Sequence, residues 1–156
     1  MSALATFRDE TRAWLAENCP QSVRQLGYIP IGSTQIELEP DTKLWLDRMV
    51  DKGWTTPTWP KEYGGAGLSK EEYRVLIEEL QYINARPPLT GRCVNYIGPT
   101  ILEFGTDAQK AKWLPVCSAG KGAWAMGYSE PSAGSDLASL NTRAEKDGDN
   151  WVINGS

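Results

Sequence analysis

The segment from Met126 to Asp136 carries the residues best suited to chemistry, because it places hydroxyl groups and glycines directly after a short apolar run. It reads Met-Gly-Tyr-Ser-Glu-Pro-Ser-Ala-Gly-Ser-Asp. A strand that enters such a loop presents hydroxyls and backbone N–H groups together, which is the donor array that a phosphate or the pyrimidine edge of a flavin needs. The same composition is also typical of a plain strand followed by a polar turn, since Ser, Gly and Pro favour turns.

Other catalytic motifs do not fit this sequence. Gly120-Lys121 lacks the earlier Gly and the following Ser or Thr of a Walker A loop, and no GxGxxG motif follows a predicted strand. Pro131 stands where a nucleophile elbow requires Gly. The chain has no His, which excludes Ser-His and Cys-His catalytic pairs and His-ligated metals, so no metal site is predicted.

Composition narrows the class of protein further. The 156 residues carry 16 Lys and Arg against 20 Asp and Glu, and this net charge of -4 disfavours a nucleic-acid-binding surface. Hydrophobic residues make up 40%, an ordinary fraction for a folded globular protein. No stretch approaches the roughly 18 apolar residues of a membrane span and the N-terminus does not resemble a signal peptide, so no membrane span is expected.

The cysteines of the chain, Cys19, Cys93 and Cys117, are far apart and form no CxxC pair. This spacing argues against a disulfide framework and against a zinc knuckle. A reducing compartment fits the pattern best, and we expect the protein to be cytoplasmic.

Helical periodicity supplies the scaffold on which the loop must be held, and it predicts five helices in the first 120 residues. The first helix ends at Cys19-Pro20. The second is capped by Asp41 and buries Trp45, Met49 and Val50 on one face.

Two capping boxes predict the starts of later helices, Ser-x-x-Glu at residues 69–72 and Thr-x-x-Gln at residues 106–109. The helix that begins with the first box ends before Pro87-Pro88, and the helix that begins with the second ends near Cys117. Between them, a short helix begins at Gly98-Pro99.

Strand patterns begin only after residue 120. An apolar run at residues 123–129, a partly alternating run at 141–146 and the β-prone residues 151–153 each predict a strand. Asp147-Gly148 predicts a hairpin turn between the last two.

The predicted fold class is therefore mainly α with a C-terminal β portion. An N-terminal helical domain spans residues 1–120, and residues 121–156 form the first strands of a β-barrel-like middle domain. Three strands do not complete a barrel or a sandwich, so we expect the sequence to be a C-terminally truncated fragment of a longer protein.

Four segments in order resemble the acyl-CoA dehydrogenase family. The loop described above resembles the family's first signature: a small residue, an apolar residue, Ser or Thr, Glu, two variable positions and then, one residue further on, Gly-Ser-Asp. Similar segments lie at residues 59–69, which read Trp-Pro-Lys-Glu-Tyr-Gly-Gly-Ala-Gly-Leu-Ser, and at 104–115 and 151–155. Tyr128 departs from the family pattern, which usually has an aliphatic residue at that position.

The resemblance implies an FAD cofactor whose isoalloxazine ring lies against residues 126–129, with Ser129 at its pyrimidine edge. Gly134 and Ser135 match the turn that approaches the FAD pyrophosphate and the pantetheine arm of an acyl-CoA. The FAD contacts implied in this way are Met126, Tyr128, Ser129, Gly134 and Ser135. The implied substrate contacts are Ser135 and the residues near the acyl cavity, Arg92, Cys93 and Tyr96.

Glu130 and Asp136 have the residue type for paired acid–base catalysis, but the resemblance implies a structural role for both. Asp136 follows Gly-Ser, and we expect its carboxylate to fix the loop by accepting backbone N–H bonds.

The implied reaction is the α,β-desaturation of an acyl-CoA thioester, as in fatty-acid β-oxidation, in which a carboxylate removes the α proton and a hydride passes to FAD. The resemblance places that Glu beyond Ser156. No catalytic residue is therefore expected within the sequence, and the fragment alone is expected to be inactive.

The resemblance also implies partners: an acyl-CoA substrate, an electron-transfer flavoprotein that receives the electrons, and a homo- or hetero-oligomeric assembly such as a homotetramer. Two other interpretations remain open on the residues alone. One is a non-catalytic subunit of a hetero-oligomeric acyl-CoA dehydrogenase, and the other is a flavin oxidase or monooxygenase of the same fold.

Overall fold

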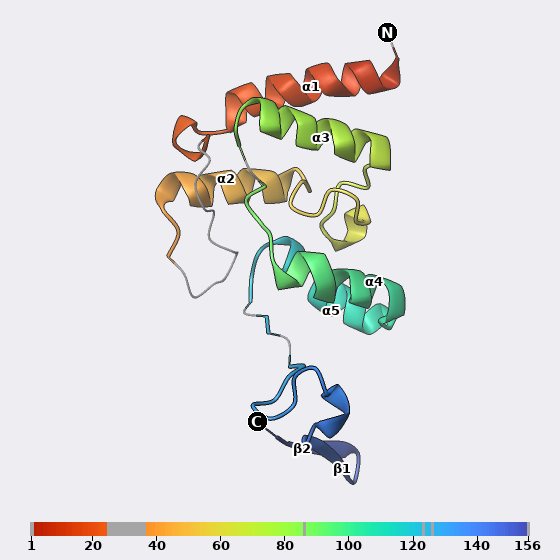
Figure 1. Ribbon diagram of the computed structural model, residues 1–156. Helices are drawn as coiled ribbons and strands as arrows, with labels where there is room; N and C mark the ends of the chain where they lie inside the picture. The colour runs from red at the N-terminus through yellow and green to blue at the C-terminus, as the bar shows by residue number, and fades with distance from the viewer. Residues whose placement is uncertain (1, 25–36, 86, 123, 126, 156) are drawn as a thin grey trace. The chain divides into compact units, whose positions relative to one another are not determined.

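The chain divides into two compact units, Met1–Trp124 and Ala125–Ser156, in a computed structural model that describes residues 2–24, 37–85, 87–122, 124–125 and 127–155 (Figure 1). The first unit contains the α-helices and the second contains a β-hairpin. The predicted class, mainly α with a C-terminal β portion, is confirmed.

The prediction of five α-helices is confirmed for the described residues before position 120. They are α1 (Ala3–Asn18), α2 (Pro40–Asp51), α3 (Lys70–Tyr82), α4 (Gly98–Phe104) and α5 (Asp107–Ser118). A π-helical turn, Cys93–Ile97, leads directly into α4. No helix among the described residues has both the length and the apolar character needed to cross a membrane.

The described residues of the helical unit form two hydrophobic cores. The larger one gathers residues from α1, α2, α3 and the segments that follow them: Leu15, Cys19, Trp45, Met49, Trp54, Leu76, Leu80 and Ala85. The smaller one lies where the π-helical turn and α5 meet the loop before α3, and it consists of Trp59, Cys93, Leu114 and Cys117. Burial of these apolar side chains is the main term that holds the helices together.

Both predicted capping boxes are present. The Ser69 hydroxyl accepts a hydrogen bond from the Glu72 backbone N–H at 3.2 Å, and the Glu72 carboxylate accepts one from the Ser69 backbone N–H at 2.8 Å. Thr106 and Gln109 form the same reciprocal pair at the start of α5. These bonds satisfy N–H groups that a helix terminus leaves without an internal partner.

The start of α2 differs from the prediction. Its cap is Glu39, Pro40 occupies the first turn, and Asp41 lies inside the helix. Pro is favoured at this position because its fixed φ suits a helix and its missing N–H has no partner there. The predicted burial is confirmed for Trp45 and Met49, whereas Val50 is only half-buried.

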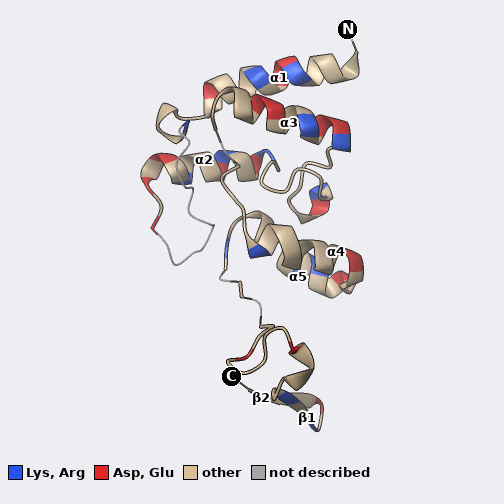
Figure 2. Cartoon of the chain, in the orientation of Figure 1, with Lys and Arg blue, Asp and Glu red and all other residues tan. Residues whose placement is uncertain are grey.

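A buried carboxylate joins α1 to α3. Glu79 lies in the buried stripe of α3 and is 2% exposed, and it accepts hydrogen bonds from Arg8 Nη1 at 2.8 Å, Arg12 Nε at 2.8 Å and Arg12 Nη2 at 2.9 Å. Figure 2 shows the basic positions of α1 beside acidic positions of α3. The two bonds from Arg12, together with the single bond from Arg8, outweigh desolvation and hold the Glu79 pKa below its ordinary value.

The second unit confirms the predicted hairpin. Strands β1 (Arg143–Asp147) and β2 (Asn150–Asn154) pair antiparallel, with Asp147 opposite Asn150 across the turn. Gly148 in the turn has φ +58°, a conformation that Gly adopts without a steric penalty.

The predicted strand at residues 123–129 is wrong for the part of this run that is described. Residues 124–125 and 127–129 are not in a strand, and Glu130 forms only an isolated bridge with Ala133. In the described chain the sheet consists of β1 and β2, so the apolar run has no neighbouring strand to pair with. Residue propensity alone does not form a strand without such a partner.

The expectation of no disulfide is also wrong for one pair. Cys93 and Cys117 are bonded, with their Cα atoms 5.8 Å apart, whereas Cys19 is free and buried. The bond joins residues 24 positions apart that tertiary packing brings together, and spacing along the chain does not reveal such proximity.

Candidate functional site

The predicted flavin-binding residues lie on an exposed loop of the second unit. Tyr128 is 67% exposed, and Ser129, Gly134 and Ser135 are exposed as well. Met126 lies outside the described residues. The hydroxyls and the aromatic ring of this loop are therefore accessible to a ligand.

Glu130 holds the loop in place. Its side chain is buried and accepts hydrogen bonds from the backbone N–H of Asn141 at 2.8 Å and of Thr142 at 2.7 Å, and a third from the Thr142 hydroxyl. These bonds, with the Thr142 hydroxyl first, lower the pKa of Glu130 from its ordinary value, although desolvation opposes them. The carboxylate thus ties the loop to the start of the hairpin.

Hydrogen bonds to backbone groups hold the loop on both sides of Gly134. Glu130 and Ala133 exchange two N–H···O bonds of 3.0 Å each, which close a tight turn. Further on, the Ser139 hydroxyl and backbone N–H donate to the Asp136 carbonyl at 2.8 and 3.2 Å. Gly134 and Ser135 lie between these two fixed points.

Asp136 does not have the role predicted for it. Within the described residues it contributes its main-chain carbonyl, and the carboxylate that accepts backbone N–H bonds is Glu130. Its partners stand 11 and 12 residues downstream. No local pattern links such positions, so the family resemblance gave Glu130 a structural role but did not identify its partners.

The chemistry of the loop residues is compatible with the FAD that the family resemblance implies. A Cβ atom placed on Gly127 or on Gly134 would meet nothing within 4 Å, so open space borders the backbone at both positions. Exposed hydroxyls at Ser129 and Ser135 stand next to these glycines. Such a surface can donate hydrogen bonds to a flavin ring edge and to a pyrophosphate without moving.

The predicted acyl-cavity residues lie in the other unit, on the π-helical turn. Arg92 and Tyr96 are exposed and four residues apart, which places them on one side of the turn. Cys93 is 7% exposed, and its sulfur is bonded to Cys117. The structure therefore brings Arg92 and Tyr96 together at the surface and turns Cys93 into the smaller core.

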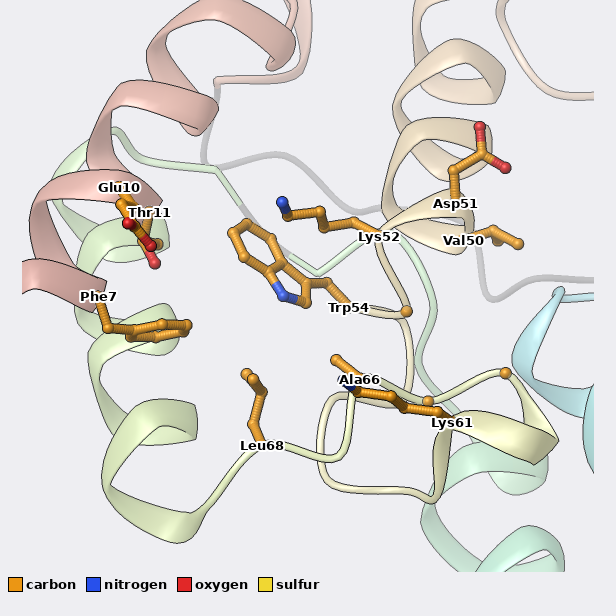
Figure 3. A pocket seen from close by; sticks show the side chains of 13 residues that line it. Phe7, Glu10, Thr11, Val50, Asp51, Lys52, Trp54, Lys61, Ala66 and Leu68 are labelled. Atoms are coloured by element: carbon orange, nitrogen blue, oxygen red, sulfur yellow. The ribbon is translucent and has the colours of Figure 1, made fainter. Parts of the chain in front are cut away.

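A separate hollow of about 480 Å³ lies in the helical unit between α1, the end of α2 and the loop before α3 (Figure 3). Phe7, Trp54 and Leu68 line it, and the Lys52 ammonium lies 5.4 Å from the centre of the Trp54 ring. The Thr11 hydroxyl at its wall is buried and has no hydrogen-bond partner in the described part of the chain. None of the predicted site residues lines this hollow.

Comparisons with known proteins agree on one family. Residues 3–121 match the family described as acyl-CoA dehydrogenase, N-terminal domain. The chain is 37% identical to acyl-CoA dehydrogenase IpdE1 of Mycobacterium tuberculosis over 99% of its own length and 40% of that protein. It is 45% identical to acyl-CoA dehydrogenase FadE26 of the same organism over 69% of its length and 26% of the relative. The chain thus spans about two fifths or less of these relatives.

Solved structures give the same picture. The Tcur3481-Tcur3483 steroid ACAD is 40% identical, with a TM-score of 0.61 over 98% of this chain and 38% of that one. The ChsE4-ChsE5 complex from Mycobacterium tuberculosis is 34% identical, with a TM-score of 0.62 over 99% of this chain and 37% of that one.

Proposed function

Because this chain belongs to the acyl-CoA dehydrogenase family, we propose that it is part of a flavin-dependent oxidoreductase that introduces an α,β double bond into acyl-CoA thioesters. The observation that carries the flavin assignment is the anchored loop. Glu130 is buried and fully engaged, whereas Ser129 and Ser135 are exposed beside open glycine backbone. A rigid loop with accessible donors binds a ligand at a low entropic cost.

Each loop residue has a proposed task toward the cofactor. Ser129 donates from its hydroxyl and backbone to the flavin pyrimidine edge, with Met126 and Tyr128 beside the ring. Gly134 allows the pyrophosphate to approach the backbone, and Ser135 donates to the pyrophosphate and to the pantetheine arm of the substrate. When bound, FAD supplies the acceptor for the hydride that leaves the β carbon.

The base that removes the α proton is proposed to lie outside residues 1–156. Glu130 is unsuited to this task, since its oxygens already accept bonds from Asn141 and Thr142 and its pKa is lowered. A general base contributes roughly 10² to 10⁴-fold to the rate. Residues 1–156 alone are therefore proposed to bind flavin weakly and to show no dehydrogenase turnover.

The acyl group is proposed to lie near Arg92 and Tyr96, with Cys93 behind them. An exposed guanidinium at this position suits an acyl tail that carries a polar or carboxylate group. An Arg92→Ala variant of the protein that contains this chain should lose its preference for such tails over plain alkyl tails. Tyr96→Phe, which keeps the ring, is the matched control. An unchanged ranking of substrates in Arg92→Ala would contradict the assignment.

The central test replaces Ser135 in the protein that contains this chain. Ser135→Leu places a bulky group between the two fixed points of the loop, so both flavin content and acyl-CoA affinity should fall. Ser132→Leu changes an exposed Ser in the same turn, at a position that the family signature leaves variable, and should retain both. Full flavin occupancy with an unchanged KM in Ser135→Leu would refute the placement of FAD on this loop.

A second candidate function is a subunit of a hetero-oligomer, in which another chain completes the catalytic site. Two of the similar structures are named after two proteins each, the Tcur3481-Tcur3483 steroid ACAD and the ChsE4-ChsE5 complex. Mass measurement of the purified native assembly distinguishes one kind of subunit from two. Steroid-derived acyl-CoA thioesters are the substrates to test first, with an electron-transfer flavoprotein as acceptor and oxygen as the alternative acceptor.

A further inference from the structure

The disulfide Cys93–Cys117 links two elements of the helical unit. Cys93 begins the π-helical turn that precedes α4, and Cys117 is next to the last residue of α5. Their Cα atoms are 5.8 Å apart, within the range of about 4.4 to 6.8 Å that a disulfide spans. The bond therefore attaches the turn to a regular helix.

The turn is held by backbone hydrogen bonds and by one covalent link to a neighbouring helix. π-helical turns are rare and are frequently found at functional sites. Gly91, just before the turn, has φ +106°. The Asn95 N–H donates to the Gly91 carbonyl at 3.0 Å, and the Gly98 N–H donates to the Cys93 carbonyl. The bond to Cys117 adds the covalent link between the turn and α5.

The two sulfurs differ in access. Cys93 is 7% exposed and lies on the turn, whereas Cys117 is 1% exposed and packs with Leu114 in the smaller core. Proteins open locally in small units, and an opening of the turn alone would uncover Cys93 before Cys117. We therefore expect Cys93 to be the sulfur that an external reagent reaches first.

We propose that Cys93 and Cys117 are a reversible redox pair that exchanges with low-molecular-weight thiols and disulfides, and that the bonded form locks the π-helical turn on α5. In oxidation, the Cys93 thiolate attacks a small-molecule disulfide and releases one small thiol. The Cys117 thiolate then attacks the Cys93 sulfur of the mixed disulfide and releases the second thiol. The cysteines lose two electrons, the small disulfide gains them, and the two thiol protons pass to the released thiols.

The disulfide also affects two exposed residues of the turn. Arg92 and Tyr96 lie on the same segment as Cys93, so a bond that restrains the turn also restrains the backbone at both residues. The redox proposal does not depend on the proposed function, because its test measures thiols and backbone motion and not turnover.

The test equilibrates the full chain in buffers of reduced and oxidised glutathione at several ratios. Acid quenching, denaturation and thiol alkylation follow, and mass spectrometry counts the alkylated cysteines. We expect the Cys93 and Cys117 peptides to change together from alkylated to bonded as the oxidised fraction rises, while Cys19 stays alkylated throughout. Hydrogen exchange of residues 93–97 should be slower in the bonded form. A pair that stays fully reduced or fully bonded at every ratio would overturn the proposal.

Two variants test the order of attack. In Cys117→Ser, the remaining Cys93 should form a stable mixed disulfide with glutathione, whereas in Cys93→Ser the buried Cys117 should not. Cys19→Ser is the matched control and should leave the exchange of the pair unchanged. Equal glutathione addition to Cys93 and Cys117 in folded variants would overturn the assignment of Cys93 as the entry point, and equal hydrogen exchange of the turn in both redox forms would overturn the lock.

Discussion

Replacing Glu79 by Gln should destabilise the helical unit by about 2 kcal/mol. The carboxylate accepts three hydrogen bonds from Arg8 and Arg12, and a bond to a charged group contributes roughly 1.5 to 3 kcal/mol. The variant does not lose the full contribution of three bonds. The Arg8 and Arg12 side chains are 36% and 52% exposed, so water hydrates them when the carboxylate is absent. The glutamine amide also retains one acceptor, which leaves the smaller net figure.

The contribution of Glu79 to the free energy of unfolding should depend on pH. The pKa of Glu79 is lowered in the folded chain by its arginine partners, whereas an unfolded Glu titrates at about 4.3. The stabilisation is therefore complete above about pH 4.3 and is lost as the pH falls through the folded-state pKa. The difference in stability between the wild-type chain and Glu79→Gln should be full at neutral pH and should shrink below about pH 4.

Urea unfolding measures this difference, because Trp14, Trp45 and Trp54 lie in or against the core that α1 and α3 share. Glu78→Gln is the matched control, since its side chain is 46% exposed and its ion pair with Arg8 is screened by water. A Glu79→Gln chain as stable as the Glu78→Gln chain at neutral pH would refute the reasoning. A difference that persists undiminished in acid would refute its electrostatic part.

Three further substitutions follow from the contacts. Gly98→Ala should destabilise the chain by about 1 to 3 kcal/mol in urea unfolding, because the new Cβ would lie 2.1 Å from Cη2 of Trp59 in the smaller core. Thr11→Val should raise the free energy of unfolding by about 1 kcal/mol, since it removes a buried hydroxyl without a partner and keeps the shape. Glu130→Gln should speed amide hydrogen exchange at Thr142, because the side-chain amide of Gln keeps a single acceptor oxygen and its NH₂ group cannot accept an N–H bond.

Each of these has a control within the chain. Gly127→Ala adds a Cβ that meets nothing and should leave stability unchanged. Thr11→Ser keeps the unpartnered hydroxyl and should show no gain. Glu145→Gln changes an exposed carboxylate of β1 and should not alter exchange at Thr142. A Gly98→Ala chain as stable as wild type would contradict the first argument, and a Thr11→Val chain less stable than Thr11→Ser would contradict the second. Equal exchange at Thr142 in Glu130→Gln and Glu145→Gln would contradict the third.

Local signals predicted the helices well because the interactions that start and end them are themselves local. Ser69 with Glu72 and Thr106 with Gln109 are bonds across three residues, and both can be identified in the sequence. The hairpin turn at Gly148 is equally local. The strand at 123–129 failed for the opposite reason, since a strand is defined by a partner that the run itself does not contain.

Tertiary contacts escaped prediction for the same physical reason. The bond between Cys93 and Cys117 joins the π-helical turn to α5, and only the folded helices bring the two together. Glu79 did carry a signal, because a carboxylate inside the apolar stripe of a helix requires a cationic partner. The identity of that partner, on a helix about 70 residues away, did not follow from the stripe.

The exposed site loop depends on a residue that no ligand needs to touch. The hydroxyls of Ser129 and Ser135, for which we propose ligand contacts, are exposed, so they do not stabilise the loop by burial. Glu130 stabilises the loop instead: its buried carboxylate accepts hydrogen bonds from Asn141 and Thr142, and the serine hydroxyls stay accessible. The Glu130 carboxylate is ionised at neutral pH, and its three accepted hydrogen bonds, which lower its pKa, link the loop to the start of the hairpin. Binding then spends little free energy on ordering the loop.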